Sequence, residues 1–142
     1  MSRTVVLVDA VRTPFGKAGS LYAGTRADDL MVRAIRGLLE RNPKVDPASI
    51  EDVAIAAATQ TGDQGMNIGR SAALLSGLPN TVPGYSVDRW CAGAMTAVTT
   101  IAGAIAMGTN EIVARNITIK PRSRSAYIHP ANKVASSAAP SS

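Results

Sequence analysis

A run of small apolar residues, Ala92 to Met107, most constrains the fold of this chain. The run carries no charged side chain and is followed by Gly108, which is typical of a helix closed by a C-terminal glycine. A helix that is apolar all round must be buried on all sides. We therefore expect a central helix packed between two sheets, which is more structure than a chain of 142 residues supplies.

The rest of the chain alternates between strand-like and helix-like patterns. Strands that alternate with helices favour an α/β fold with a mixed, mostly parallel sheet, here in the order βαβαβαβ around the buried central helix. The predicted elements are a buried strand from Thr4 to Ala10, a helix from Arg26 to Arg41 capped by Thr25 and ended by Asn42-Pro43, a strand from Val53 to Ala58, a helix capped by Asn67 and stopped by Gly77, a short strand before Cys91, and a strand that begins at Asn110.

The composition changes abruptly at Arg115. The net charge of +5 comes from the five basic residues of the last segment, because no Asp or Glu follows Glu111. We predict that residues 1–114 form one partial domain and that residues 115–142 form an unrelated, disordered, basic and Ser-rich tail, such as a frameshifted or truncated reading frame would produce. The basic residues are not densely clustered, so we expect no nucleic-acid binding.

Cysteine usage and hydropathy narrow the class of protein further. The single cysteine excludes an intramolecular disulfide and a Cys-based zinc cluster. We expect no metal site and find no Gly-rich phosphate-binding motif. Because the start of the chain lacks a signal-peptide pattern and the apolar run is shorter than the ~20 residues of a membrane span, we expect a cytoplasmic protein without a membrane segment.

Cys91 is the candidate catalytic residue. It lies between the short strand and the apolar helix, where free backbone N–H groups and the helix dipole stabilise a thiolate. In an α/β fold, functional groups gather at the C-terminal ends of strands, and Cys91 follows such an end. A lone cysteine is more often a buried structural residue. The local sequence favours a nucleophile here.

Four segments around these elements together resemble the thiolases, the acetyl-CoA acyltransferase family, over about residues 3–114. No single segment is decisive, but the four occur in the family's order, with the expected strands and helices between them. They are Val8-Asp9-Ala10-Val11-Arg12-Thr13-Pro14-Phe15-Gly16, Gly62-Asp63-Gln64-Gly65-Met66-Asn67-Ile68-Gly69-Arg70, Gly77-Leu78-Pro79, and Asp88-Arg89-Trp90-Cys91-Ala92-Gly93-Ala94.

The resemblance implies a function as well as a fold. Cys91 matches the family's nucleophile, which forms an acyl-thioester intermediate with acyl-CoA substrates in reactions such as fatty acid β-oxidation. Coenzyme A is then a substrate and not a permanently bound cofactor; no cofactor-binding residue is predicted. The family implies a homo-oligomer, a dimer or tetramer, and a five-layer sandwich around the Cys-bearing helix. Because a methionine often lies near the acyl chain in thiolases, Met95 is a candidate pocket residue, although packing is its more usual role.

The chain also differs from the family pattern. Asp88 stands where Asn is common, and Ala92-Gly93-Ala94 stands where any residue followed by Ser-Gly is usual. The family's second half, with its Gly-His-Pro histidine and second cysteine, is missing; His129-Pro130 lacks the preceding glycine. We therefore predict a truncated thiolase-type acyltransferase without full activity. The alternative is a non-catalytic thiolase fragment that acts only by association with itself or with a full-length thiolase.

Overall fold

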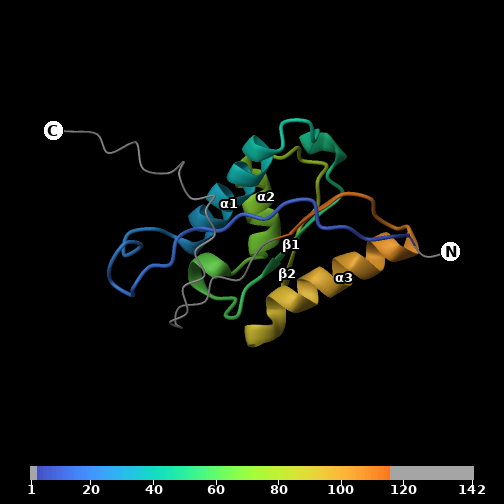
Figure 1. The fold of residues 1–142 in the computed structure, drawn as a ribbon. Helices are drawn as coiled ribbons and strands as arrows, with labels where there is room; N and C mark the ends of the chain where they lie inside the picture. The colour runs from blue at the N-terminus through green and yellow to red at the C-terminus, as the bar shows by residue number, and fades with distance from the viewer. Residues whose placement is uncertain (1–2, 116–142) are drawn as a thin grey trace.

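The structure is a computed structural model, and it describes residues 3–115 (Figure 1). Its centre is a three-stranded sheet in the order β2-β1-β3, formed by β1 (Asp52–Ala56), β2 (Tyr85–Val87) and β3 (Val113–Arg115). Both outer strands run parallel to β1. This arrangement confirms the predicted α/β fold with a parallel sheet, and it places the C-terminal ends of all three strands at one edge.

Three longer helices cover the two faces of the sheet. Helices α1 (Ala27–Arg41) and α2 (Ile68–Ser76) lie on one face, and α3 (Gly93–Met107) lies on the other (Figure 1). The alternation along β1 explains this division, since Val53 and Ile55 belong to the core with α1 and α2, whereas Ala54 packs with α3. The described residues also contain three single-turn helices: η1 (Pro47–Ser49), η2 (Gly62–Gln64) and η3 (Trp90–Ala92).

The helix ends agree with the sequence prediction except at the start of α1. Asn67 caps α2 as predicted, because its side chain accepts a hydrogen bond from the Arg70 amide, and Gly77 and Gly108 end α2 and α3 in the left-handed conformation. Thr25 as the cap of α1 was wrong. The N-cap is Arg26, which makes no capping bond of its own, and the Asp63 carboxylate accepts the Ala27 N–H at 2.6 Å instead.

The predicted buried strand from Thr4 to Ala10 was also wrong. This N-terminal segment is extended across the molecule but joins no ladder, and its side chains are largely exposed, Val8 at 79%. It is held at its two ends: Arg3 bonds to Glu111 and to the Ala106 carbonyl, and Asp9 bonds to Arg41 and Asn42. A strand forms only when a neighbour completes its hydrogen bonds, and residues 3–115 supply none here.

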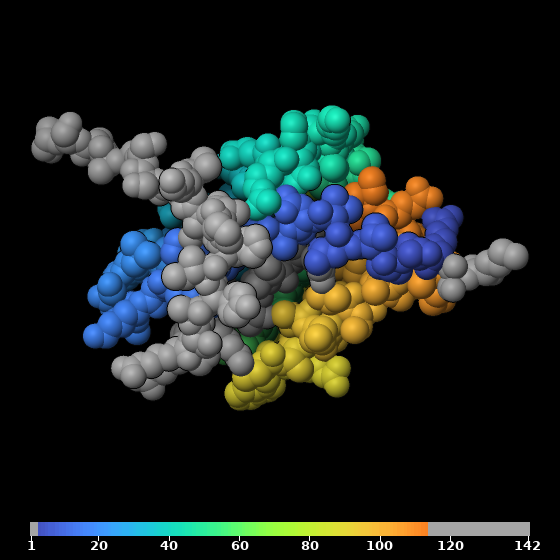
Figure 2. Space-filling model, viewed as in Figure 1, coloured from blue at the N-terminus to red at the C-terminus, as the bar shows by residue number. Residues whose placement is uncertain are grey.

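The apolar helix is covered on one side only. Within α3, Gly93, Ala97 and Ile101 are buried, whereas Met95 and Met107 are 67% and 82% exposed. The expected burial on all sides is therefore wrong for residues 3–115, which contain one sheet and not two. Figure 2 shows the surface of α3, in yellow and orange, bare along the lower side of the molecule. By length and composition alone, Trp90–Met107 is also long enough to cross a membrane, contrary to our expectation, although core helices of soluble proteins pass the same test.

The last predicted strand is shorter than expected, with β3 confined to Val113–Arg115. The tail predicted from residue 116 onward lies outside the described residues.

Candidate active site

Cys91 lies where the sheet, a strained turn and α3 meet. Strand β2 ends at Val87, whose carbonyl accepts the Ala57 amide at 3.0 Å, and the chain then turns through Asp88 and Arg89 into η3. The turn is closed by backbone bonds from Ala92 to Arg89, at 2.9 Å, and from Gly93 to Trp90. The thiol is thus presented at the C-terminal edge of a parallel sheet and at the N-terminal end of α3, as the sequence predicted.

The Cys91 thiol is free and exposed. This exposure excludes the usual alternative, a buried structural cysteine, within the described residues. A thiol at a helix N-terminus lies in the positive field of the helix dipole and close to backbone N–H groups that have no helical partner. Such a thiol can attack an electrophilic carbonyl from solvent.

Small residues allow α3 to approach the sheet closely beneath the thiol. A Cβ added at Gly93 would lie 3.0 Å from the Ala56 side chain, so the helix begins in direct contact with β1. The guanidinium of Arg89 donates to the Thr96 hydroxyl at 3.1 Å, and that hydroxyl donates to the Ala92 carbonyl at 3.0 Å. These bonds connect the turn to the first two turns of α3, and the position of Cys91 is therefore set from both sides.

A network of hydrogen bonds connects the start of α2 with β2, the strand that precedes Cys91 in the chain. The Asn67 amide donates to the Gly84 carbonyl at 2.9 Å, and its carbonyl oxygen accepts from the Ser86 hydroxyl at 3.2 Å. Ser86 also accepts the Gly69 N–H at 3.2 Å. Beside this network, burial raises the pKa of Tyr85, with a smaller effect from the Asp52 charge. The strand that leads to Cys91 is thereby fixed before the turn begins.

The segment Gly62–Arg70 of the resemblance is consistent with these structural roles. Its Asp63 caps α1, its Asn67 caps α2, and its Gly69 lies so close to β2 that an added Cβ would collide with the Tyr85 carbonyl oxygen. Arg70 donates to the Val82 and Asn80 carbonyls. Met66 and Asn67 both adopt a positive φ. These side chains support the strand that carries the site and do not meet Cys91 in any contact we find.

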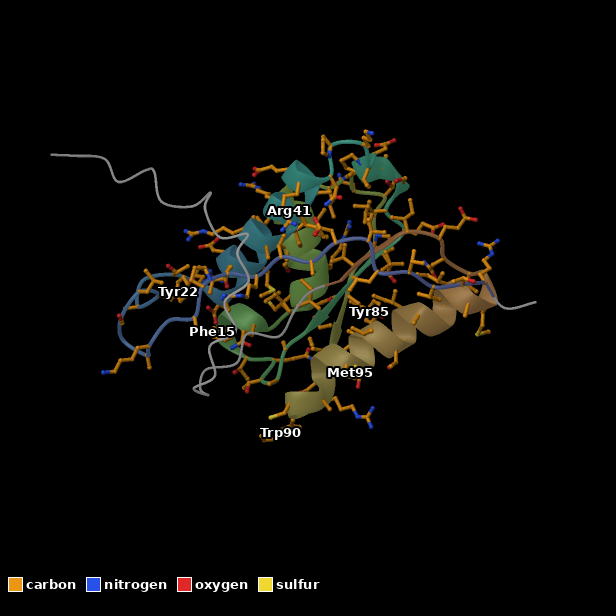
Figure 3. The ribbon with its side chains drawn as sticks, viewed as in Figure 1. Phe15, Tyr22, Arg41, Tyr85, Trp90 and Met95 are labelled. Atoms are coloured by element: carbon orange, nitrogen blue, oxygen red, sulfur yellow. The ribbon has the colours of Figure 1, made fainter. Side chains whose placement is uncertain are left out.

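Sequence reasoning missed the conformation of Trp90. This residue has φ of 47°, a left-handed backbone that a bulky side chain rarely adopts, and its indole is 77% exposed (Figure 3). A resemblance to the family's motif gives the residue's place but not its backbone angle. A strained residue directly before a candidate nucleophile is typical of functional sites.

Met95, the candidate pocket residue, lies in the first turn of α3, four residues beyond Cys91, and is exposed rather than packed in the core. The guanidinium of Arg12, in the first segment of the resemblance, lies 5.5 Å from the centroid of the Phe15 ring, within the N-terminal loop. Among residues 3–115, no three His, Cys, Asp or Glu side chains are grouped to hold a metal ion.

Comparison with known proteins identifies the family. The model of the thiolase N-terminal domain matches residues 5–116. The chain is 44% identical to a beta-ketoadipyl-CoA thiolase of Pseudomonas knackmussii over 128 residues, which are 90% of this chain and 32% of that protein. It is 45% identical to a 3-ketoacyl-CoA thiolase of Pseudoalteromonas translucida over 107 residues, 75% of this chain and 28% of that protein.

The chain spans about a third of the length of these curated relatives. The match covers the sheet, the three helices and the turn that bears Cys91, so the observed α/β fold and the family agree. The chain belongs to the thiolase family, through its N-terminal domain.

Proposed function

We propose that this chain is a thiolase-type acyltransferase whose acyl-enzyme forms on Cys91. The overall reaction is the conversion of acyl-CoA and acetyl-CoA to CoA and 3-oxoacyl-CoA. The observation that carries the proposal is the exposed thiol at the N-terminal end of α3, in a chain of this family. The curated relatives are named as thiolases that act on 3-ketoacyl-CoA and on beta-ketoadipyl-CoA, and we propose acyl-CoA substrates for this chain too.

The first half-reaction exchanges one thioester for another at Cys91. Its sulfur attacks the thioester carbonyl carbon of an acyl-CoA, the bond from that carbon to the CoA sulfur breaks, and CoA leaves as a thiol with the proton that the cysteine lost. A sulfur nucleophile suits this exchange because the product is again a reactive thioester. Coenzyme A is a substrate and leaving group in this scheme, and none stays bound.

By the family resemblance, full turnover also uses a histidine and a second cysteine for acid–base chemistry. The 142 residues contain one cysteine and one histidine, His129, which lies outside the described residues. General acid–base groups contribute typically 10²–10⁴-fold to a rate. We therefore propose that this form accepts an acyl group but, alone, lacks full thiolase activity.

Intact-mass spectrometry after incubation with acetyl-CoA and acetoacetyl-CoA tests the acyl-enzyme. We expect one added acyl group on the wild-type chain and none on Cys91→Ala. Cleavage of acetoacetyl-CoA with added CoA, measured beside an intact thiolase, should be absent or far slower. A chain that stays unmodified while the intact thiolase is acylated would contradict the proposal.

The bare face of α3 favours a second function, association without catalysis. Met95, Thr99, Gly103 and Met107 are all exposed and recur every four residues, so they form one charge-free stripe along the helix. Exposed apolar surface marks interaction sites, and Met95 and Met107 supply it in this stripe. Under this alternative the chain binds a second copy of itself or a full-length thiolase.

Light scattering and co-purification with a full-length thiolase separate the two functions. If association is the function, Met107→Glu should abolish it, whereas Leu75→Glu, on an exposed side chain of α2, should leave it intact. A monodisperse monomer that does not bind the thiolase would exclude this alternative and also the homo-oligomer that the family implies. A role in fatty acid β-oxidation, a cytoplasmic location, and the absence of membrane and nucleic-acid binding remain predictions.

A further inference from the structure

The backbone of Trp90 is strained, and no packing contact of its side chain within residues 3–115 compensates for the strain. Its φ of 47° is unfavourable for a residue with a Cβ and a large ring. Its amide donates to the Asp88 carboxylate at a long 3.4 Å, and its carbonyl accepts from Gly93. The indole, 77% exposed, is not anchored in either core. The packing of residues 3–115 therefore gives no reason for a tryptophan at this position.

The position of Trp90 relative to the thiol suggests a reason. Trp90 immediately precedes Cys91 in η3, and Met95 follows four residues after Cys91, in the first turn of α3. Figure 3 shows Trp90 and Met95 at the same end of α3, with Trp90 pointing away from the rest of the molecule. An acyl group on the Cys91 sulfur would therefore be carried by the residue next to an exposed indole, at the end of α3 that also bears the exposed Met95.

We propose that Trp90 is a specificity-determining residue whose indole forms an apolar wall for the acyl chain carried by Cys91. This inference rests on the proposed function, because it presumes that Cys91 accepts the acyl group. A flat aromatic surface removes several methylenes of a chain from water but gains little from an acetyl group. Trp90 thus favours longer aliphatic acyl groups over acetyl.

The wild-type chain itself provides a direct readout. Trp90 is the only tryptophan, so selectively excited fluorescence reports on this side chain alone. When Cys91 is acylated from hexanoyl-CoA, we expect the emission to shift to shorter wavelength, and to shift much less with acetyl-CoA. Cys91→Ala with the same donors shows whether non-covalent binding accounts for the change. An emission spectrum that is the same for the hexanoyl adduct and the free chain would overturn the proposal.

Rates of acylation give the second test. Three variants are compared with acetyl-, butyryl- and hexanoyl-CoA by intact mass: Trp90→Gly, which suits the positive φ but removes the wall; Trp90→Phe, which keeps an aromatic ring; and Leu75→Ala, the control on an exposed side chain of α2. We expect the ratio of hexanoyl to acetyl rates to fall about tenfold in Trp90→Gly. The ratio should be nearly kept in Trp90→Phe and unchanged in Leu75→Ala.

The outcomes separate the possible failures. Alkylation of Cys91 by iodoacetamide at the wild-type rate in Trp90→Gly shows that the thiol is still presented normally, so a changed ratio then reports the wall. Equal loss with every donor would make Trp90 a positioning residue and overturn the proposal. An unchanged ratio with normal acylation would overturn this inference and leave the proposed function standing. No adduct on the wild-type chain with any donor would overturn the proposed function and this inference together. Loss of copurification with a full-length thiolase in Trp90→Gly, at an unchanged ratio, would assign the indole to a protein interface instead.

Discussion

The two faces of the sheet differ in the size of the buried core that packs against them. On the side of α1 and α2, twelve buried residues form one continuous core that includes Val53, Ile55 and Val82, each 1% exposed. On the side of α3, the core consists of Ala54, Ala97 and Ile101, with partly buried neighbours around it. Both faces use the same central strand, so the difference lies in what packs against it.

The comparison shows that the larger core and the candidate site lie on opposite faces of the sheet. The well-packed face holds β1 and β2 in register, and the open face presents the turn with Cys91. A substitution on the face of α1 and α2 should therefore mainly lower the stability of the fold. A substitution on the face of α3 should lower stability less and affect the candidate site more. Four experiments test this division, in order of decreasing effect.

The largest difference should come from matched truncations on the two faces. Ile55→Ala in the larger core should cost about 4 kcal/mol of unfolding free energy, near the upper part of the usual range for buried aliphatic residues. Ile101→Ala on the α3 side should cost about 2 kcal/mol, since its surroundings are open and can relax. Urea denaturation measures both. Equal costs would contradict the asymmetry between the faces.

Close packing of α2 on β2 gives the next effect. An added methyl at Gly69 would collide with the Tyr85 backbone, so Gly69→Ala should destabilise the chain by about 3 kcal/mol. Gly37→Ala is the matched control within α1, because no atom lies within 4 Å of the Cβ that it would add. That substitution should stabilise by about 0.5–1 kcal/mol through helix propensity. Thermal melting of the two variants should shift in opposite directions; a shared direction would show that α2 can move away from β2.

The two helix starts should respond differently to loss of a carboxylate. Asp63 accepts the Ala27 amide at 2.6 Å and replaces a cap that Arg26 lacks, so Asp63→Ala should cost about 1 kcal/mol. Asp88 accepts the Trp90 amide at only 3.4 Å, and Asp88→Ala should change stability by less than about 0.5 kcal/mol. Both are read from the midpoint of urea unfolding. A larger effect at Asp88 would mean that the turn before Cys91 is a stabilising element of its own.

Acidification should have the smallest effect and acts away from the open face. A hydrogen bond from Asn42, with help from the Ala10 amide and Arg41, lowers the pKa of Asp9 below its ordinary 3.8, and a hydrogen bond from Arg26 lowers the pKa of Asp28. Both carboxylates therefore stabilise the fold above about pH 4, and this contribution is lost as the pH falls further. Replacing both by Asn should flatten the acid side of the stability profile. An unchanged profile would show that these exposed pairs contribute nothing.

Much of the fold followed from the sequence because the local signals and the tertiary contacts agree. The pattern in α1, the cap at Asn67, and the glycines at 77 and 108 act within one or two turns, and the structure has them as predicted. The strand at Thr4–Ala10 and the buried central helix failed for one shared reason. Their patterns indicate burial, but burial needs a second layer that residues 3–115 do not contain.

The sequence predicted the location of the candidate site but not its backbone conformation. Cys91 was located from the junction of strand and helix and from the family resemblance, and the structure puts it at that junction. The left-handed angle at Trp90 and the cap that Asp63 gives α1 had no sequence signal, since neither follows from residue type or spacing. A backbone angle and a contact over 36 positions depend on how the whole turn closes.

The sequence positions of the two cores also set an order for folding during synthesis. Every buried residue of the larger core lies between Met31 and Val82, so that core can close as soon as a nascent chain of that length leaves the ribosome. The strand β3 pairs with β1 across some sixty positions and must wait for much later residues. For that interval the charge-free helix α3 has an incomplete sheet to dock against. The step at which the candidate nucleophile reaches its final place is therefore also one at which the nascent chain exposes apolar surface.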